Sequence, residues 1–401
     1  MKRILFLSGL DFKEKSIQVI RKTPEAYAEA DWEVDYIVAR DNLENGNYFY
    51  EDEINIKGVN ILRIYWPFPK LRTKLPKHTK LLIGKLSSFI TIVKLAYAAQ
   101  KLLRKNEYDV VYGYELHGVL AMHILKIFFS KNIKTVSRFQ GTFLHEMFSK
   151  KQYLRLLFNL DLILAIRLNS DLLIMTNDGT QGDKAVRKIK GAKPFNMSFW
   201  ANGVDLFQHI NNPICIKDNK KVFLSVSRLV DWKKVERCLY LLDALKKLGF
   251  DNFKYYVVGD GNQKHKLQLL ALELDLEDNI EFIGAVNQNQ VLAYMAGTDF
   301  FLSMYDSSNV GNPLLEAIRT NTIIITLANG DTPSWIQHKY NGYIYDPDHI
   351  DFDFIAKDLL KLINDKPLQL QLLRNLKDTE NKKLWTWSER MTNEINHVTS
   401  L

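Results

Sequence analysis

A cationic loop near the middle of the chain combines two residue types that bind phosphate. Arg228 and Lys233 stand after the apolar run Val222–Val226 and before a helical pattern that starts at Val235. A forked guanidinium and a flexible ammonium in one loop can converge on a single diphosphate. An isolated pair of cations would more often be solvated, but ligands of open parallel sheets bind beyond the carboxyl ends of the strands. The position of this loop therefore favours a phosphate site.

A pair of glycines flanks Asp260 directly after the next apolar run. Gly259 and Gly261 permit a sharp turn or a close approach of the backbone to a ligand. Lys264 stands where the third glycine of a dinucleotide-binding fingerprint would be, so the segment is not that fingerprint. Taken alone, it predicts a tight strand-to-helix turn more often than a binding loop.

A third loop, Tyr305–Asn312, leads into a helix that is predicted to start near Pro313. Gly311 and Asn312 would expose backbone N–H groups at the helix N-terminus, where anionic or hydroxyl-rich ligands bind. Glu316 is expected in the first turn of this helix. Its carboxylate either is stabilised there by the helix dipole or accepts hydrogen bonds from a ribose diol, and the spacing leaves both interpretations open.

The elements that must position these loops alternate between short apolar runs and helical patterns, which predicts parallel α/β architecture. Expected strands are Ile4–Ser8, Val34–Val38, Asn60–Tyr65, Val110–Tyr112, Ile133–Ser137, Leu172–Thr176, Val222–Val226, Tyr255–Val258, Ile280–Ile283, Phe300–Leu302, Ile323–Thr326 and Gly342–Tyr345. Expected helices are Leu81–Leu103, Gly118–Phe129, Val235–Leu248, Gln263–Leu274, Asn289–Ala296 and Pro313–Arg319. Two such series predict two Rossmann-like, doubly wound domains with a cleft between them. The expected division is residues 1–205, a polar linker 206–220, residues 221–380 and a C-terminal helix within 381–401.

Composition is that of a globular protein, with 46% apolar and 25% charged residues. Two cysteines, Cys215 and Cys238, are too few for a disulfide framework and are expected to be idle thiols in a reducing cytosol. The first residues resemble a signal peptide only superficially, because charges follow the short apolar run at once. No uncharged run approaches the length of a membrane span, so a cytoplasmic protein is expected.

The net charge of +8 is unevenly distributed. Ten basic residues and no Asp or Glu occur between Lys70 and Asn106. The segment Lys70–Lys105 could dock on an anionic membrane at the inner face of the cell, or Leu81–Leu103 could be a core helix with a solvated basic face, and both interpretations stand. Nucleic acid is not an expected partner, because no recognition motif combines aromatic and basic residues.

Five segments together resemble the retaining glycosyltransferases of family 4, which have the GT-B fold. They occur in the order and spacing of the family, and they are Asn202–Asp205, Ser227–Leu229 with Lys233, Gly259–Gly261, Gly311–Ala317 and the loop at Gly330. The ending Trp387–Arg390 is similar to the family's final helix, which crosses back to the first domain. The resemblance covers nearly all of the second domain.

This resemblance implies roles for individual residues. Arg228 and Lys233 would hold the donor diphosphate and Glu316 the ribose, as the catalytic set. The further donor-binding residues that it implies are Gly259, Gly261, Ser308, Asn309, Gly311, Asn312, Leu315, Gln140 and Gly9. Family members usually need no metal and no cofactor beyond the nucleotide sugar, which is a substrate.

The chain departs from the family pattern at three places. Ser308 stands where the first of two paired glutamates is common, Gln140 where a histidine is frequent, and Gly9 is alone in a loop that often has two glycines. Glutamine can donate and accept hydrogen bonds but cannot carry a proton. The nucleotide half of the predicted site is therefore better supported than the catalytic half.

The resemblance implies transfer of a hexose or N-acetylhexosamine from a nucleoside diphosphate sugar, with UDP favoured over GDP. The acceptor would be a glycan or a lipid-linked sugar in surface polysaccharide synthesis. Two alternatives stay open. One is a GT-B sugar-nucleotide epimerase that uses acid–base groups of the first domain, with Glu115, His117 and His145 as candidates, and the other is a non-catalytic nucleotide-binding subunit.

Overall fold

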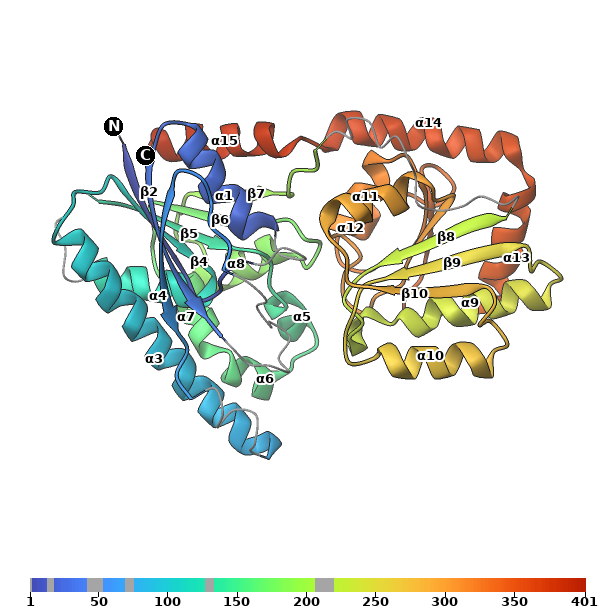
Figure 1. Cartoon of the computed structure of the whole chain (residues 1–401), viewed down its shortest axis with the longest axis horizontal. Coiled ribbons are helices and arrows are strands. Elements are labelled where there is room, and N and C mark those ends of the chain that lie inside the picture. Colours follow the sequence, from blue (N-terminus) through green and yellow to red (C-terminus); the bar gives the residue numbers. More distant parts are fainter. Residues whose placement is uncertain (1, 13–17, 42–52, 69–75, 127–132, 206–219) are drawn as a thin grey trace. The chain divides into compact units, whose positions relative to one another are not determined.

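The structure is a computed structural model that describes residues 2–12, 18–41, 53–68, 76–126, 133–205 and 220–401. The chain forms two compact units (Figure 1). The first comprises Met1–Asn177, Gln181–Asn202 and Trp387–Leu401, and the second comprises Asp178–Thr180 and Gly203–Thr386. The boundary thus lies at Asn202 rather than at residue 205, and most of the predicted linker lies outside the described residues.

The first unit is built on a parallel sheet with the strand order β3-β2-β1-β4-β5-β6-β7. Its strands are β1 (Arg3–Ser8), β2 (Glu33–Arg40), β3 (Val59–Tyr65), β4 (Val110–Tyr114), β5 (Lys134–Phe139), β6 (Leu172–Thr176) and β7 (Met197–Trp200). Its helices are α1 (Gln18–Glu29), α3 (Lys77–Leu103), α4 (Glu115–Lys126), α5 (Leu144–Ser149), α6 (Tyr153–Phe158), α7 (Leu160–Arg167), α8 (Gly182–Lys190) and α15 (Trp387–Thr399). Strands β1 to β3 are added toward one edge of the sheet and β4 to β7 toward the other, so the strand order reverses between β1 and β4.

Both faces of this sheet are buried, as the alternation along β1 shows. Ile4 and Phe6 belong to a core cluster with side chains of α1 and α15, whereas Leu5 and Leu7 belong to a cluster with α3 and α4. Burial on both faces explains why the strands read as continuous apolar runs in the sequence. Figure 1 shows α15 beside α1, although the two helices are far apart in the sequence.

The second unit is built on a parallel sheet with the order β10-β9-β8-β11-β12-β13. Its strands are β8 (Lys221–Val226), β9 (Phe253–Val258), β10 (Ile280–Gly284), β11 (Phe300–Ser303), β12 (Ile323–Leu327) and β13 (Tyr343–Tyr345). Its helices are α9 (Val235–Lys247), α10 (Lys264–Glu273), α11 (Gln288–Ala296), α12 (Asn312–Arg319), α13 (Phe352–Asn364) and α14 (Lys366–Lys383), with the single turns η1 (Asp231–Lys233) and η2 (Thr332–Ser334). In this sheet the strand order reverses between β8 and β11. Ligands of doubly wound sheets bind at such a switch point, beyond the carboxyl ends of the strands.

The structure has a strand at each place where the sequence predicts one, and it adds β7. The predicted fold class is confirmed, since both units are doubly wound parallel α/β structures. The C-terminal segment differs in detail from the prediction. Residues up to Lys383 belong to α14 of the second unit, and the helix that joins the first unit begins only at Trp387.

Candidate functional site

The loop after β8 is fixed by backbone hydrogen bonds to the loop after β9. Ser227 N–H donates to Val258 O at 3.0 Å, and Leu229 N–H donates to Asp260 O at 2.9 Å. The side chain of Arg228, between these two anchors, is exposed. A rigid backbone thus presents a solvent-facing guanidinium at the carboxyl edge of the sheet.

Gly259 and Gly261 make this close pairing of loops possible. Their φ angles are +136° and +159°, and a Cβ at either position would overlap the carbonyl oxygen of Ser227 or of Leu229. Glycine is therefore required at both positions because the two loops of the chain approach each other closely. The two glycines thus help to hold the loop that carries Arg228.

Lys233 lies in η1, in a cage of aromatic rings. Its Nζ is 3.6 Å from the ring centroid of Tyr305 and 4.1 Å from that of Trp232. Burial, together with the nearby charge of Arg228, lowers the pKa of Lys233 to about 7. The charged form of a lysine that has little compensating negative charge in the ligand-free protein is stabilised strongly when a diphosphate binds beside it.

Glu316 lies in α12, but not in its first turn as predicted. The helix begins at Asn312 and has no acidic residue in its first turn, so Glu316 is the fifth helical residue. Its side chain is only 4% exposed and accepts a hydrogen bond from Gln288 Nε2 at 2.8 Å. Burial raises its pKa to about 7. Because Glu316 lies beyond the first turn, stabilisation by the helix dipole does not explain a buried carboxylate in this place.

Gly311 and Asn312 start α12 as predicted. Gly311 is the N-cap residue in extended conformation, and a Cβ on it would meet nothing nearer than Pro313 Cδ at 3.8 Å. The approach to this helix end is therefore open on the side of Gly311, so a donor oxygen could reach its backbone.

Three other predicted donor residues have contacts within the protein in this structure. Asn309 Oδ1 accepts from Ser303 Oγ and Tyr305 N–H, both at 2.9 Å, and its amide donates to Leu327 O at 3.2 Å. Leu315 is 1% exposed, and its N–H donates to Gly311 O. The Asn309 side chain thus holds the loop together and the Leu315 side chain fills the core, and a contact of either residue with the donor stays a prediction. Ser308 donates to Asp178 O at 3.0 Å.

That last contact brings in Asp178, a residue that the sequence analysis did not single out. The segment Asp178–Thr180 packs on the second unit, where Asp331 N–H donates to Gly179 O at 2.9 Å. The carboxylate of Asp178 accepts from the Thr180 hydroxyl at 2.6 Å. Burial raises its pKa to about 6, partly offset by these hydrogen bonds and by the charge of Lys233. Asp178 therefore supplies a carboxylate near the lysine of the phosphate loop.

Asp306 does not play this part, although it lies only two residues from Ser308. Its carboxylate is 2.7 Å from Arg237 Nη2 and 3.7 Å from Lys234 Nζ, at the beginning of α9. Asp306 thus connects the loop after β11 to the start of α9, where its charge is paired with Arg237 and Lys234.

The predicted turn at Asn202–Asp205 and the loop at Gly330 also have structural partners. Val204 N–H donates to Trp385 O, and Val204 O accepts from Arg319 Nη2, both at 2.9 Å. Gly330 has φ +54°, and a Cβ there would overlap Gly179 O. These two motifs shape the second unit, and Gly330 in particular leaves room for the segment that carries Asp178.

In the first unit, the carboxyl ends of β1, β4 and β5 gather Gly9, His117 and Gln140. A Cβ on Gly9 would lie 2.6 Å from the His117 ring, which packs edge-on against Trp66. Gln140 N–H donates to Glu115 Oε1 at 2.6 Å, and its side-chain oxygen lies 3.4 Å from both Tyr114 Oη and Thr176 Oγ1. Two of the predicted donor residues thus lie among polar groups at a sheet edge.

Glu115 adopts a left-handed backbone conformation with φ +56°, which is uncommon for a residue with a side chain. This conformation turns the Glu115 carboxylate toward Gln140 at the start of α4. Such strained residues concentrate at functional sites. His145, the third acid–base candidate, lies in α5, after the loop that carries Gln140.

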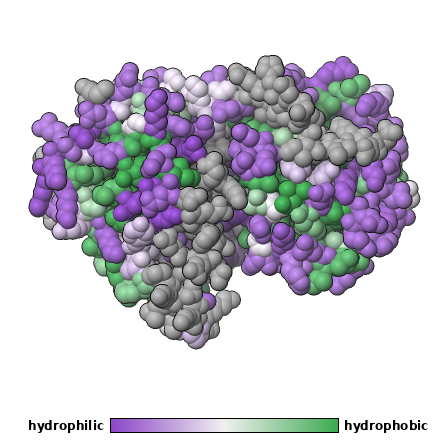
Figure 2. Space-filling model, viewed as in Figure 1, coloured by the Kyte–Doolittle hydropathy of each residue, from purple (hydrophilic) through white to green (hydrophobic). Residues whose placement is uncertain are grey.

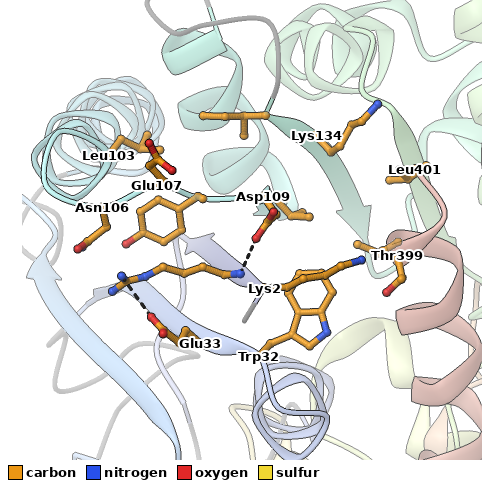
Figure 3. A pocket seen from close by; sticks show the side chains of 15 residues that line it. Lys2, Trp32, Glu33, Leu103, Asn106, Glu107, Asp109, Lys134, Thr399 and Leu401 are labelled. Atoms are coloured by element: carbon orange, nitrogen blue, oxygen red, sulfur yellow. Dashed lines mark hydrogen bonds and ion pairs between the residues drawn. The ribbon is translucent and has the colours of Figure 1, made fainter.

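A pocket of about 860 Å³ lies at the opposite edge of the first sheet (Figure 3). It is lined by residues that precede β2 and β4, among them Trp32 and Glu107. Within it, the backbone N–H of Arg3 donates to Asp109 Oδ2 at 2.7 Å, and Arg3 Nη1 lies 3.2 Å from Glu33 Oε2. The amino ends of parallel strands are not where these sheets bind ligands, so this pocket is not the candidate site.

Among the described residues, no group of three or more His, Cys, Asp or Glu side chains is arranged to hold a metal ion. Cys238 is a buried free thiol, and burial raises its pKa to about 11, as expected for an idle cysteine. Cys215 lies outside the described residues.

Two doubly wound units with a cationic loop and a buried carboxylate at the carboxyl edge of the second sheet define the GT-B class. Solved structures have a similar fold over the full length of this chain. Sucrose-phosphate synthase of Thermosynechococcus elongatus has a TM-score of 0.76 at 16% identity, with 100% of this chain and 98% of that chain covered. HepE of Anabaena, in complex with UDP-glucose, has a TM-score of 0.69 at 16% identity, with 100% of both chains covered.

The sequence comparisons match part of the chain to a known family. Residues 208–379 match the family model described as "Glycosyl transferases group 1". Alpha-monoglucosyldiacylglycerol synthase of Streptococcus pneumoniae is 29% identical over 143 residues, which are 35% of this chain and 32% of that protein. The match thus spans about a third of this curated relative. Residues 208–379, less than half of the chain, are thus similar to the group 1 glycosyltransferases.

Proposed function

We propose that this protein transfers a hexose or N-acetylhexosamine from a UDP-sugar to a glycan or lipid-linked acceptor, with retention of the anomeric configuration. The observation that carries the proposal is the set formed by Arg228, the caged Lys233 and the buried Glu316 at the switch point of the second sheet. The preference for UDP over GDP is supported by HepE, a structural neighbour solved with UDP-glucose. A lipid-linked acceptor is supported by the diacylglycerol in the name of the pneumococcal relative.

In this proposal the residues have distinct tasks. Arg228 and Lys233 bind the two phosphates, and Glu316 accepts hydrogen bonds from the ribose. The bond between the anomeric carbon and the diphosphate oxygen breaks while the acceptor oxygen bonds to that carbon on the same face. The acceptor proton passes to the leaving phosphate oxygen, and a nucleoside diphosphate departs. No metal is needed, because the two cations and the α12 N-terminus stabilise the developing negative charge.

The test is a donor screen followed by kinetics. Purified protein is mixed with UDP- and GDP-sugars, and thermal shift identifies the donor that stabilises it. Arg228→Ala and Lys233→Ala should each lower kcat/KM with that donor by about a hundredfold or more, the usual loss when one group that stabilises developing charge is removed. Lys247→Ala, which alters an exposed lysine of α9 in the same unit, is the matched control.

The same assay separates the alternatives. Near-normal turnover in both variants would sink the assignment of the phosphate-binding pair. Release of UDP and free sugar without any acceptor would favour the epimerase, for which the strained Glu115 and the neighbouring His117 are the acid–base candidates. Binding of UDP without turnover of any donor would favour a non-catalytic subunit.

A further inference from the structure

Helix α3 is apolar on two opposite sides. Its inner side supplies Ile92, Leu95, Ala96 and Ala99 to a core cluster of the first unit. Its outer side carries large apolar side chains at spacings of three and four residues, between 45% and 69% exposed, namely Leu82, Leu86, Phe89, Val93 and Tyr97. Figure 2 shows hydrophobic side chains at the lower-left margin of the molecule, where Figure 1 draws α3. A helix that is hydrophobic all round is normally covered on every side or lies in a membrane.

The neighbouring pair α6 and α7 exposes a second apolar group. No residue of α6 is buried, and the exposed large side chains of the pair, 50% to 76% exposed, are Tyr153, Leu154, Leu157, Phe158, Leu160 and Leu164. Lys85 of α3 is 2.6 Å from Asp161 of α7, so the two groups adjoin. We refer to the exposed side chains of these three helices together as the α3/α6–α7 surface. Apolar patches of this extent on a soluble unit mark an interaction surface.

The charges around the surface select its partner. No Asp or Glu occurs from Lys70 to Asn106, and α3 carries Lys80, Lys85, Lys94 and Lys101 beside the apolar side chains. Exposed leucine and aromatic side chains flanked by lysines are typical of elements that lie in the interface of an anionic bilayer. A second copy of this chain would bring the same positive charge to the contact.

The surface adjoins the carboxyl edge of the first sheet. Ser88 Oγ, on the inner side of α3, is 2.8 Å from His117 Nε2, and Ser87 Oγ donates to Pro67 O just after β3. Helix α5, which precedes α6, begins at Leu144, four residues after Gln140. The middle of α3 therefore lies next to a polar group at the carboxyl edge of the first sheet.

We infer that the α3/α6–α7 surface inserts into the head-group and acyl boundary of an anionic lipid bilayer, with α3 parallel to the membrane plane. Over Thr79–Leu103, α3 is long and apolar enough to cross a membrane by length and composition, which the sequence analysis did not anticipate. Crossing would remove Leu95 and Ala99, both 0% exposed, from the core. Neither sequence-based interpretation of this segment describes it fully, because the outer side of α3 is apolar as well as basic.

Vesicle flotation tests the inference with the full chain. Wild-type protein should float with vesicles of phosphatidylglycerol and phosphatidylethanolamine at low salt and remain largely bound at high salt, because apolar insertion is not screened. The variant Leu86→Gln/Phe89→Gln/Leu154→Gln/Leu157→Gln should lose about tenfold or more of its vesicle affinity. The control Leu269→Gln/Leu272→Gln changes two exposed leucines of α10, 47% and 56% exposed, and should float like the wild type.

Several outcomes would overturn the inference. These are failure of the wild type to float at low salt, equal flotation of the fourfold variant, and wild-type self-association that the variant loses in sedimentation while neither binds vesicles. Resistance of the bound protein to alkaline carbonate would indicate a spanning helix in place of one in the membrane plane. UDP affinity and thermal unfolding of the fourfold variant should match the wild type, so the outcome is independent of the proposed sugar transfer.

Discussion

Ser308 and Asp178 meet where family 4 enzymes commonly have a glutamate. A serine has no carboxylate, and the Ser308 hydroxyl instead donates a hydrogen bond to the backbone carbonyl of Asp178. The aspartate side chain is thereby placed near Lys233, with a raised pKa of about 6 that leaves it mostly ionised at neutral pH. Folding thus brings a residue with a carboxylate next to the loop in which the motif lacks one.

Asp178→Asn should separate chemistry from nucleotide binding. The substitution keeps the size of the side chain and removes its charge, so we expect a fall in kcat of about tenfold, the cost of one charge-assisted hydrogen bond to the donor sugar. UDP affinity should be equal or higher, because a negative charge near the diphosphate is gone. Steady-state kinetics and calorimetry measure the two effects. Asp306→Asn is the control, and an unchanged kcat in Asp178→Asn would refute the role.

Nucleotide binding should weaken as the pH rises through neutrality. The pKa of Lys233 is lowered to about 7, so above that pH the free protein must take up a proton for the ammonium to meet the diphosphate. The association constant of UDP should then fall by up to about tenfold per pH unit. Ionisation of Asp178 acts in the same direction, whereas ionisation of Glu316, with a pKa of about 7, favours the ribose contact.

Calorimetry in buffers of different ionisation enthalpy counts the proton directly. Lys233→Arg keeps the charge at every pH and should flatten the profile, while Glu316→Gln should steepen it and weaken binding overall. A UDP affinity of the Glu316→Gln variant that does not change between mildly acidic and mildly alkaline pH would contradict the lowered pKa of Lys233, because the opposing ionisation of Glu316 is then absent.

At the scale of elements, the sequence predicted the strands that have a regular apolar pattern, and it missed elements that lack one. Apolar runs buried on both faces gave the strands, but β7 is short and was not recognised. Helices α6 and α7 were also missed, because their outer sides are apolar and no polar face marks the helical period. Arg228 and Lys233 were recognisable within one loop. Asp178 was not, because folding brings it from a distant turn after β6, and only its Asn-Asp-Gly-Thr composition signalled a loop there.

The paired loops after β8 and β9 should be sensitive to a single methyl group. Gly259→Ala forces a residue at φ +136° against Ser227 O, and we expect a loss of about 1–3 kcal/mol of unfolding free energy together with weaker UDP binding. Gly311→Ala is the control, since its extended backbone accepts a side chain and no atom lies within 3.5 Å. Urea unfolding should leave Gly311→Ala near the wild type. Equal stability of both variants would show that the close approach of the two loops is not required.

At the scale of the molecule, the first unit is completed by α15. Glu394 of this helix, 0% exposed, lies 2.9 Å from Arg138 of β5 and 2.8 Å from Arg390, and accepts a hydrogen bond from Tyr112 at 2.9 Å. Burial alone would raise the pKa of Glu394, but the two arginines outweigh it and lower that pKa. The carboxylate therefore contributes stability at neutral pH that is lost as the pH falls through its lowered pKa.

Glu394→Gln should destabilise the first unit strongly. Two buried guanidinium groups would lose their shared counter-charge, and removal of one member of a buried ion pair typically costs about 3–5 kcal/mol. Glu389→Gln, on the exposed side of the same helix, should change little. Chemical unfolding followed by tryptophan fluorescence compares them, and equal stabilities would mean that α15 is held by apolar packing alone.

The return of α15 to the first unit also governs the order of events during synthesis. Residues 1–202 leave the ribosome first, yet Arg138 is then without Glu394, and the side chains of Trp387, Met391 and Val398 are missing from the core. The whole second unit must be translated before those residues exist. While the second unit is being made, the growing chain thus carries an incomplete hydrophobic interior and an arginine without its counter-charge, a state in which chaperones or early contact with a lipid surface would matter most.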